Sequence, residues 1–460
     1  MEKVCEPARE VPVVAEVDVC VVGGGPGGVP AAVAAARQGA KVLLIERHGF
    51  LGGMATAGLI GPILGHVASR SHVPVLGGIP RELCKRMAAI GQAMDWDEAV
   101  ATCWGVPFDP EGFKIVADRL IREAGVRLML HAFCVGSVVR DGRVTHVVVE
   151  SKSGRQAVAA KIFVDATGDA DVAFWAGAEC TLGRPADGRP MAMGSMFRIG
   201  GVGGLDGGAR DAALAAMRRA VQDGSANFYH ITLGHLGSTV RADELTANIT
   251  RRAGDGTRVE DLTDAELAIR EQMWQALELW RSAPGAEGLY LIATPAHVGV
   301  RETRQVVGLA RLTGQDVVDA RKQPDGIARA GYWIDIHCPR GSVGQGTVHL
   351  CSRKCADRSC YMVREFADQL PDELYPPEGE WFDIPYRALV PVRVDGLLIA
   401  GRCISGDHQA MAAVRVMGTC MAIGEAAGTA AAMAADAGCQ PRALDVPALR
   451  ARLSAAGVLL

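Results

Sequence analysis

The chain of 460 residues has few aromatic side chains, 5% of the total, and a formal net charge of only −4. No segment carries a long run of Lys and Arg or of Asp and Glu. Proteins that bind nucleic acid or anionic membrane surfaces usually concentrate positive charge in such runs. The sequence therefore indicates that neither nucleic acid nor a membrane is a main partner.

Long apolar runs are also missing. Residues 1–14 include acidic side chains and no apolar core, so they do not resemble a secretory signal. No window approaches the ~18 uninterrupted apolar residues of a membrane span, because even the Ala-rich stretch 425–436 is interrupted by charge and Gly. We therefore expect a soluble, cytoplasmic protein.

Glycine, with 56 residues, is abundant, and one glycine-rich turn has a recognisable context. Residues 18–22 read as a buried strand, Gly23-Gly-Gly25-Pro-Gly-Gly28 follows, and residues 30–38 read as a helix of small side chains. Glycines at these spacings let the backbone turn tightly and approach a pyrophosphate. Glu46 ends the next strand, 41–46, where a carboxylate can bind ribose hydroxyls. This pattern predicts a dinucleotide-binding βαβ unit.

Three blocks, residues 18–56, 164–171 and 397–428, together resemble the FAD-dependent oxidoreductase family, which is allied to the fumarate-reductase and glutathione-reductase flavoproteins. The resemblance implies FAD as the cofactor. A helix beginning near Val416 would also direct its positive end at the flavin. The predicted cofactor-binding residues are Gly23, Gly25, Pro26, Gly27, Gly28, Glu46, Arg47, Gly52, Gly53, Met54, Val135, Ala166, Thr167, Gly168, Gly401, Arg402, Val416, Met417 and Thr419.

The predicted fold class is α/β, with a Rossmann-type FAD-binding domain split between the two ends of the chain. Residues 1–180 would form its N-terminal part, with a β-meander over 127–164, and residues 381–460 its C-terminal part. Residues 181–380 would form an inserted α+β substrate domain with a long helix beginning at the capping box of Thr263 and Glu266.

The 13 cysteines are odd in number, which argues against a disulfide framework. Four of them, Cys338, Cys351, Cys355 and Cys360, fall within 23 residues, with His349 nearby as a spare ligand. Thiolates at such spacing suit Zn²⁺ or a 4Fe–4S cluster. Three interpretations stay open: an iron–sulfur electron relay, a zinc site, or unrelated free cysteines.

A flavin enzyme also needs groups that bind substrate and move protons. The candidates are His408, directly after the predicted strand 396–400, and His66, which follows the block 18–56. Arg301, with Arg304 beside it, could bind a carboxylate. Each also has a plain interpretation, as a core histidine or a paired arginine.

We therefore expect a dehydrogenase or reductase that transfers hydride between flavin N5 and a small organic substrate. One alternative is a flavin and iron–sulfur electron-transfer protein with an electron-acceptor protein as partner. Two others are a flavin monooxygenase and a non-catalytic FAD-binding protein. The sequence indicates neither the substrate nor the oligomeric state.

Overall fold

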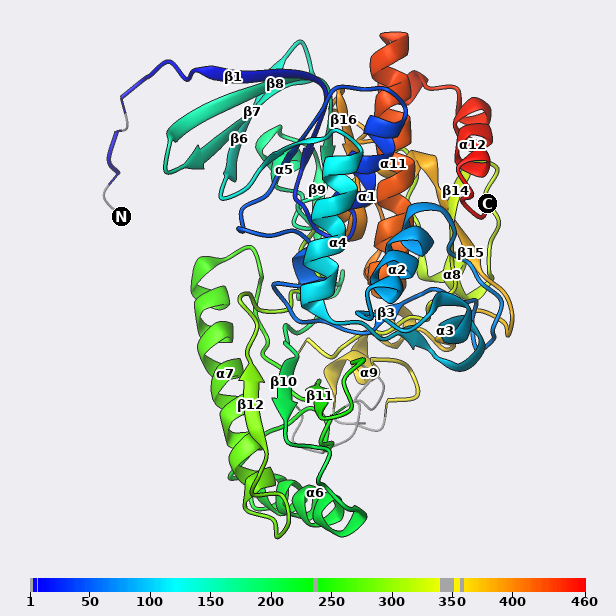
Figure 1. Cartoon of the computed structure of the whole chain (residues 1–460). Coiled ribbons are helices and arrows are strands. Elements are labelled where there is room, and N and C mark those ends of the chain that lie inside the picture. Colours follow the sequence, from blue (N-terminus) through cyan, green and yellow to red (C-terminus); the bar gives the residue numbers. More distant parts are fainter. Residues whose placement is uncertain (1–2, 6, 235–238, 340–350, 356–359) are drawn as a thin grey trace.

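The computed structural model describes residues 3–5, 7–234, 239–339, 351–355 and 360–460. The chain forms a large lobe built from both of its ends and a smaller lobe built from its middle, which lies below it in Figure 1.

The large lobe contains a seven-stranded sheet of mixed direction. Its strands run in the order β5 (Arg127–Met129), β2 (Val42–Ile45), β1 (Val13–Val22), β8 (Gly154–Asp165), β7 (Arg143–Ser151) and β6 (Phe133–Arg140), and β16 (Leu397–Ile399) also pairs with β8. The pairs β5–β2, β2–β1, β1–β8 and β8–β16 are parallel, whereas β6, β7 and β8 form an antiparallel meander. The predicted Rossmann-type α/β fold is confirmed. The first strand of the meander predicted over 127–164 begins at Phe133 and not at Arg127, because residues 127–129 form β5, which pairs with β2.

Two helices from opposite ends of the chain pack closely beside this sheet, α1 (Gly28–Arg37) and α11 (Met417–Ala437) (Figure 1). A Cβ atom on Gly424 would lie 1.9 Å from the carbonyl oxygen of Gly27, and one on Gly428 would lie 2.0 Å from that of Ala31. The small residues of α11 therefore allow the two helix backbones to touch. This contact and the β16–β8 pairing join the two ends of the chain into one lobe.

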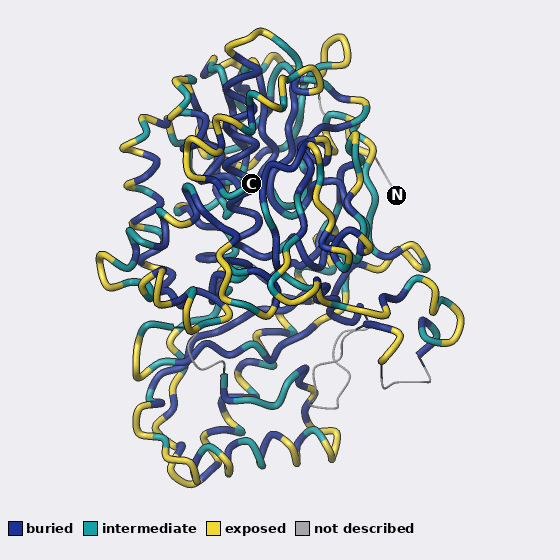
Figure 2. Tube along the Cα trace, turned by 90° about the vertical axis from the view of Figure 1, so that its right-hand side faces the viewer, coloured by how far each residue is buried: buried dark blue, intermediate teal, exposed yellow. Residues whose placement is uncertain are grey.

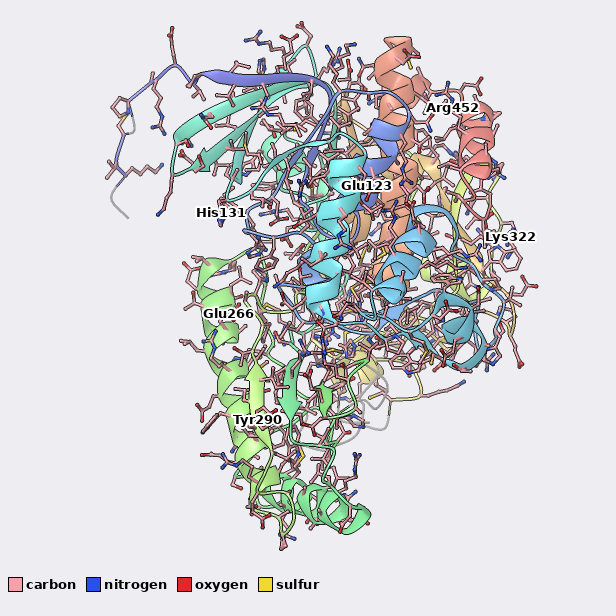
Figure 3. All side chains as sticks on the ribbon, in the orientation of Figure 1. Glu123, His131, Glu266, Tyr290, Lys322 and Arg452 are labelled. Atoms are coloured by element: carbon pink, nitrogen blue, oxygen red, sulfur yellow. The ribbon has the colours of Figure 1, made fainter. Side chains whose placement is uncertain are left out.

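The small lobe has its own hydrophobic core, made by residues between Met193 and Val300. It comprises β11 (Glu244–Ala247), β10 (Phe197–Gly200), β12 (Tyr290–Ala293), α6 (Gly207–Gln222) and α7 (Val259–Arg281). The rings of Phe197 and Trp280 stack at 5.8 Å inside this core. Figure 2 shows buried stretches of chain in both lobes, and Figure 3 labels Glu266 on α7 and Tyr290 on β12.

The predicted start of the long helix at Thr263 is wrong, because α7 begins four residues earlier, at Val259. The Thr263 hydroxyl donates to the carbonyl oxygen of Val259 at 2.7 Å, so it bonds back along the helix instead of capping it. Glu260 and Asp261 occupy the first turn, where negative charge is favourable.

The other elements complete the large lobe and the region between the lobes. They are β3 (Ile63–Leu64), α2 (Gly78–Ala89), α3 (Trp96–Thr102), β4 (Gly105–Val106), α4 (Pro110–Glu123), α5 (Asp171–Trp175), β9 (Cys180–Leu182), β13 (Arg304–Val306), α8 (Gly314–Val318), β14 (Gly326–Ala330), α9 (Tyr361–Glu365), β15 (Phe382–Pro385), α10 (His408–Val414) and α12 (Val446–Ala455). Buried residues from Val306 to Leu370 belong to the core of the large lobe. The division at residues 181 and 380 stays a prediction.

Among the described residues, no single helix has both the length and the apolar composition needed to cross a membrane. The pair α10 and α11 meets those two criteria only when taken together, and it is bent by 92°.

Candidate active site

A first cavity lies where β1, β2, β8 and β16 end, since Val22, Ile45, Ala166 and Ala400 all line it. Such a crevice beyond the carboxyl ends of parallel strands is the usual ligand site of an open α/β sheet. The remaining lining residues come from both ends of the chain and from the middle: Gly23, Gly25, Pro26, Gly27, Glu46, Arg47, His48, Gly53, Met54, Ala132, Phe133, Cys134, Thr167, Gly168, Asp169, Asp171, His297, Val300, Gly401, Arg402, Arg415, Met417 and Cys420.

The glycine turn after β1 shapes this cavity. Gly23 has a φ of +101°, and its N–H donates to the carbonyl of Ile45 at 2.8 Å. A Cβ on Gly28 would lie 1.7 Å from the carbonyl oxygen of Gly23, so that glycine is required for packing. A Cβ on Gly25 would meet no protein atom closer than 3.7 Å, because it would project into the cavity that Gly25 lines.

Glu46 is buried at the floor of this cavity, just after β2. One carboxylate oxygen accepts a hydrogen bond from the Gly24 N–H at 2.7 Å, and the other accepts from the His48 N–H at 2.8 Å. Each oxygen retains acceptor capacity for a ligand hydroxyl. The side chain is thus held in place before any ligand binds.

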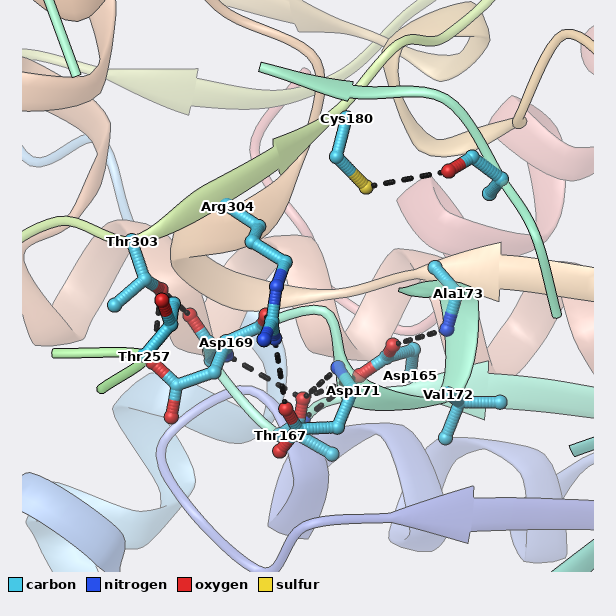
Figure 4. Close-up of polar contacts among 12 residues, drawn as sticks. Asp165, Thr167, Asp169, Asp171, Val172, Ala173, Cys180, Thr257, Thr303 and Arg304 are labelled. Atoms are coloured by element: carbon cyan, nitrogen blue, oxygen red, sulfur yellow. Dashed lines mark hydrogen bonds and ion pairs between the residues drawn. The ribbon is translucent and has the colours of Figure 1, made fainter. Parts of the chain in front are cut away.

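The end of β8 carries a group of acidic residues with defined partners (Figure 4). Asp165 accepts from the N–H of Thr167 at 3.1 Å and from that of Ala173 at 2.9 Å, and burial raises the pKa of its carboxyl. Burial also acts to raise the pKa of Asp169, but the Arg402 guanidinium, with which Asp169 forms an ion pair, leaves it lowered overall. This strand end therefore presents ordered backbone and charged groups to the cavity.

The helix α11 begins at Met417, where its positive end faces the cavity wall. Met417 also lines a second cavity of about 250 Å³, and so do Met54, Val300, Arg402 and Arg415. The two cavities therefore share a wall, and a ligand in one lies beside a ligand in the other.

The second cavity contains a polar network between the lobes. The His337 imidazole lies 3.0 Å from the Tyr229 hydroxyl through Nδ1 and 3.1 Å from an Asp335 carboxylate oxygen through Nε2. Because the Arg251 guanidinium can only donate and lies 3.2 Å from Nδ1, Nδ1 accepts and Nε2 carries the hydrogen. Arg415 donates to the same carboxylate at 3.0 Å.

Burial lowers the pKa of His337 well below its usual value, and the Arg301 and Arg251 guanidinium groups lower it further. The carboxylate of Asp335 acts in the opposite direction without reversing the shift. The pKa of Asp335 itself stays below its usual value, because His337 and Arg415 offset the effect of its burial. The resting state is thus a neutral imidazole hydrogen-bonded to an ionised carboxylate.

The structure brings most of the predicted cofactor residues to the first cavity: Gly23, Gly25, Pro26, Gly27, Glu46, Arg47, Gly53, Met54, Ala166, Thr167, Gly168, Gly401, Arg402 and Met417. Val416 lines the second cavity. Gly28, Gly52, Val135 and Thr419 line neither. Gly28 serves helix packing, and Phe133 and Cys134 line the wall beside Val135.

Of the predicted catalytic residues, only Arg301 lines the second cavity. His408 is buried with Nδ1 2.9 Å from Glu302, and His66 is buried with Nε2 3.3 Å from the carbonyl of Ala99. Neither histidine lines either cavity.

Sequence reasoning missed the polar residues Tyr229, Arg251, Asp335, His337 and Arg415. One local signal for them existed. Asp335 and His337 are two residues apart, a spacing that puts side chains on the same side of an extended chain.

The four clustered cysteines Cys338, Cys351, Cys355 and Cys360 are all buried. Burial and then the neighbouring Cys338 thiol raise the pKa of Cys351 to about 12, so this thiol is protonated at neutral pH. No group of three or more His, Cys, Asp or Glu within the described ranges could hold a metal ion, and His349 lies outside them. The zinc or iron–sulfur site is therefore not confirmed and stays a prediction.

A model of the family described as FAD dependent oxidoreductase matches residues 18–453. The chain belongs to this family. Among solved structures, it is similar to a geranylgeranyl bacteriochlorophyll reductase-like protein from Thermoplasma acidophilum, with 13% identity over 96% of this chain and 83% of that one and a TM-score of 0.41. It is also similar to a triple mutant of the flavin-dependent brominase Bmp2, with 12% identity over 95% and 84% and a TM-score of 0.42. No curated protein matches it. Similarities this distant concern the fold and not the reaction.

The first cavity fits FAD, the cofactor of this family. The open space above Gly25 admits a pyrophosphate next to the backbone, and Glu46 is fixed where a ribose would lie. Arg47 lines the same cavity and could donate to an anionic cofactor, as could Arg402 and Arg415, which are paired with Asp169 and Asp335. These residues would hold FAD, and the start of α11 would face its ring.

Proposed function

We propose that the protein is a dehydrogenase or reductase whose small organic substrate binds in the second cavity, beside FAD in the first. The observation that carries this proposal is the wall shared by the two cavities, formed by Met54, Val300, Arg402, Arg415 and Met417. When bound, FAD supplies hydride transfer through its ring. The chain supplies the space for the substrate and the groups that bind it and move its proton.

His337 and Tyr229 would transfer the proton of the reaction. When the carbon of a C–O or C–N bond gives or takes a hydride, the oxygen or nitrogen must also lose or gain a proton. The Tyr229 hydroxyl would exchange the proton with the substrate. The neutral imidazole of His337 accepts a hydrogen bond from this hydroxyl at Nδ1, 3.0 Å away, and Asp335 at Nε2 fixes the orientation of the ring. Of the sequence-based candidates, we retain Arg301 as a substrate-binding residue. We propose His337, instead of His408 or His66, for the role in proton transfer.

The test starts with the absorbance spectrum of the purified protein, which should show about one FAD per chain. Small hydroxy, amino and enoate compounds are then screened anaerobically for bleaching or reoxidation of the flavin bands. With an active compound, His337→Gln should slow bleaching by roughly 10²- to 10⁴-fold at unchanged FAD content.

His66→Gln is the matched control, since His66 is also buried and lines neither cavity. Absence of flavin, or equal rates for both variants, would refute the proposal. Turnover that instead consumes oxygen together with NAD(P)H would assign the protein to the monooxygenases.

A second candidate function is electron transfer from FAD through a metal cluster to an acceptor protein. Its support is limited to the burial of Cys338, Cys351, Cys355 and Cys360 and to the effect of the other three thiols on the pKa of Cys351, because these thiols do not form a group that could hold a metal ion in the described part of the chain. Iron, sulfide and zinc analysis of anaerobically purified protein tests it. About four irons per chain would support the relay, and absence of both metals would remove it.

A further inference from the structure

Positive charge dominates the second cavity. Four arginines line it, Arg251, Arg301, Arg402 and Arg415, against one carboxylate, Asp335. Arg402 is paired with Asp169 and Arg415 with Asp335. Neither of these ion pairs includes the guanidinium group of Arg251 or Arg301.

Arg251 is fixed by the protein around it. Its guanidinium donates to the side-chain oxygen of Asn248 at 3.0 Å, contacts Nδ1 of His337 and lies over the Tyr229 ring at 3.8 Å. Burial lowers its pKa to about 10. The charge of Asp335 acts to raise its pKa but does not offset its burial.

Arg301 is the least satisfied of the four. It is 9% exposed, and within the described ranges its one hydrogen bond is the donation from Nη1 to the carbonyl of Ala192 at 2.9 Å. Burial, and then the charges of Arg251 and Arg415, lower its pKa well below its usual value, and the charge of Asp335 opposes this shift without reversing it. A buried cation with no carboxylate in hydrogen-bond contact is costly, and a ligand that brings a second negative charge would relieve that cost.

The rest of the wall is apolar, and it determines what kind of anion fits. Ile60, Pro62, Leu64 and Met196 line the space within the cavity's volume of about 250 Å³. A bare inorganic ion would leave these surfaces without contacts. An organic anion would place an apolar body against them and its charge on the guanidinium groups.

An outer cavity of about 340 Å³ adjoins the second one, because Trp104, Tyr332 and Trp333 line both. The ring of Trp333 stacks on that of Tyr375 at 5.1 Å there. Flat apolar groups that extend away from Arg301 would therefore meet aromatic side chains.

We propose that the second cavity binds an organic carboxylate with an apolar body, whose carboxylate group is held by Arg301 beside Arg251. A guanidinium group suits this anion because it can donate two parallel hydrogen bonds to the two oxygens. The proposal that this cavity binds a carboxylate depends only on the residues that line it. That the bound carboxylate is the substrate rests on the function proposed above.

Benzoate and benzamide are the probes, since they share a flat apolar body and differ in charge. Binding to the FAD-loaded protein is measured by calorimetry and by perturbation of the flavin absorbance, at constant ionic strength. Benzoate should bind at least ~10-fold more tightly than benzamide. Arg301→Gln, which keeps a donor for Ala192, should remove this preference, and Arg301→Lys should restore part of it.

Arg198→Gln is the matched control. Arg198 is also 9% exposed but is paired with Asp109 and Glu244, and it lies outside the cavity lining. Arg198→Gln should lower the melting temperature and leave the preference for benzoate intact. Arg301→Gln should leave the melting temperature equal or higher, because it removes a buried charge that has no ion-pair partner among the described residues.

Equal binding of benzoate and benzamide, or equal benzoate affinity in Arg301→Gln and the parent, would overturn the proposal. So would displacement of benzoate by chloride or phosphate at matched concentration, because the site would then be one for inorganic anions. These readouts need no turnover. If benzoate binds as expected while no compound bleaches the flavin, the site stands and the proposed function fails.

Discussion

Glu425, in the middle of α11, offers the sharpest test of the packing between the two ends of the chain. Its side chain is 3% exposed, and a carboxylate oxygen accepts from the Ile79 N–H at the start of α2 at 2.9 Å. Burial raises the pKa of its carboxyl from 4.5 to about 7, against the smaller opposite effect of the Ile79 hydrogen bond. Glu425 therefore titrates in the folded protein near neutral pH.

A raised pKa means that the folded state binds the proton more tightly than the unfolded state. The free energy of unfolding consequently falls as pH rises from 4.5 through 7 and then levels off. The shift corresponds to about 3 kcal/mol above pH 7 and about 1 kcal/mol at pH 5. Glu425→Gln removes the charge but keeps an oxygen for the Ile79 N–H. This variant should be more stable than the parent by those amounts at each pH.

The assay is urea unfolding at pH 5, 6, 7 and 8 in excess FAD, with the variant minus the parent as the measured quantity. Glu271→Gln, on the exposed face of α7, is the control and should give a flat, near-zero difference. A difference for Glu425→Gln that is the same at pH 5 and pH 8 would refute the reasoning, because an uncharged buried carboxyl and a charged one would then cost the same.

Five further variants test the glycine turn, the Glu46 carboxylate, and the roles of Thr263 in α7 and Asp109 at the start of α4. Gly25→Ala should fold normally by circular dichroism yet purify without flavin, whereas Gly28→Ala should fail to fold, since its Cβ would lie 1.7 Å from the Gly23 carbonyl oxygen. Glu46→Gln should weaken FAD binding by ~10- to 100-fold in a fluorescence titration, because charge-assisted hydrogen bonds are lost. Thr263→Ala should change the free energy of unfolding by less than about 0.5 kcal/mol. Asp109→Ala should cost about 2–4 kcal/mol by denaturation, because it loses the cap of α4 and a carboxylate partner of Arg198.

The cofactor half of the site could be predicted because its signals are local. The glycines from Gly23 to Gly28 and the carboxylate of Glu46 lie within one βαβ unit, where the strand ends alone determine their positions. Gly401 and Arg402, which follow β16 after Ala400, were expected from the family resemblance of the block 397–428.

The substrate half could not be predicted in this way. Tyr229, Arg251, His337 and Arg415 come from four separate segments, and only the folded arrangement of the chain brings them beside Arg301, the one sequence-based candidate in this cavity. No spacing in the sequence encodes that encounter.

His408 was a candidate on the sequence but does not line either cavity. It follows the strand β16 closely, but α10 directs its ring to Glu302, 2.9 Å away, and not into either cavity. Nearness to a functional strand along the chain did not decide where the ring points.

The pairing of β16 with β8 has a consequence for how the protein is made. The glycine turn leaves the ribosome early, but Gly401, Arg402 and Met417 follow almost 400 residues later. Until then, the nascent chain exposes the edge of β8 and the apolar face of α1 to solvent and to other chains. The cofactor cavity is therefore complete only when nearly the whole chain has been made, and a product that stops before Leu397 would lack Gly401, Arg402 and Met417 from its wall.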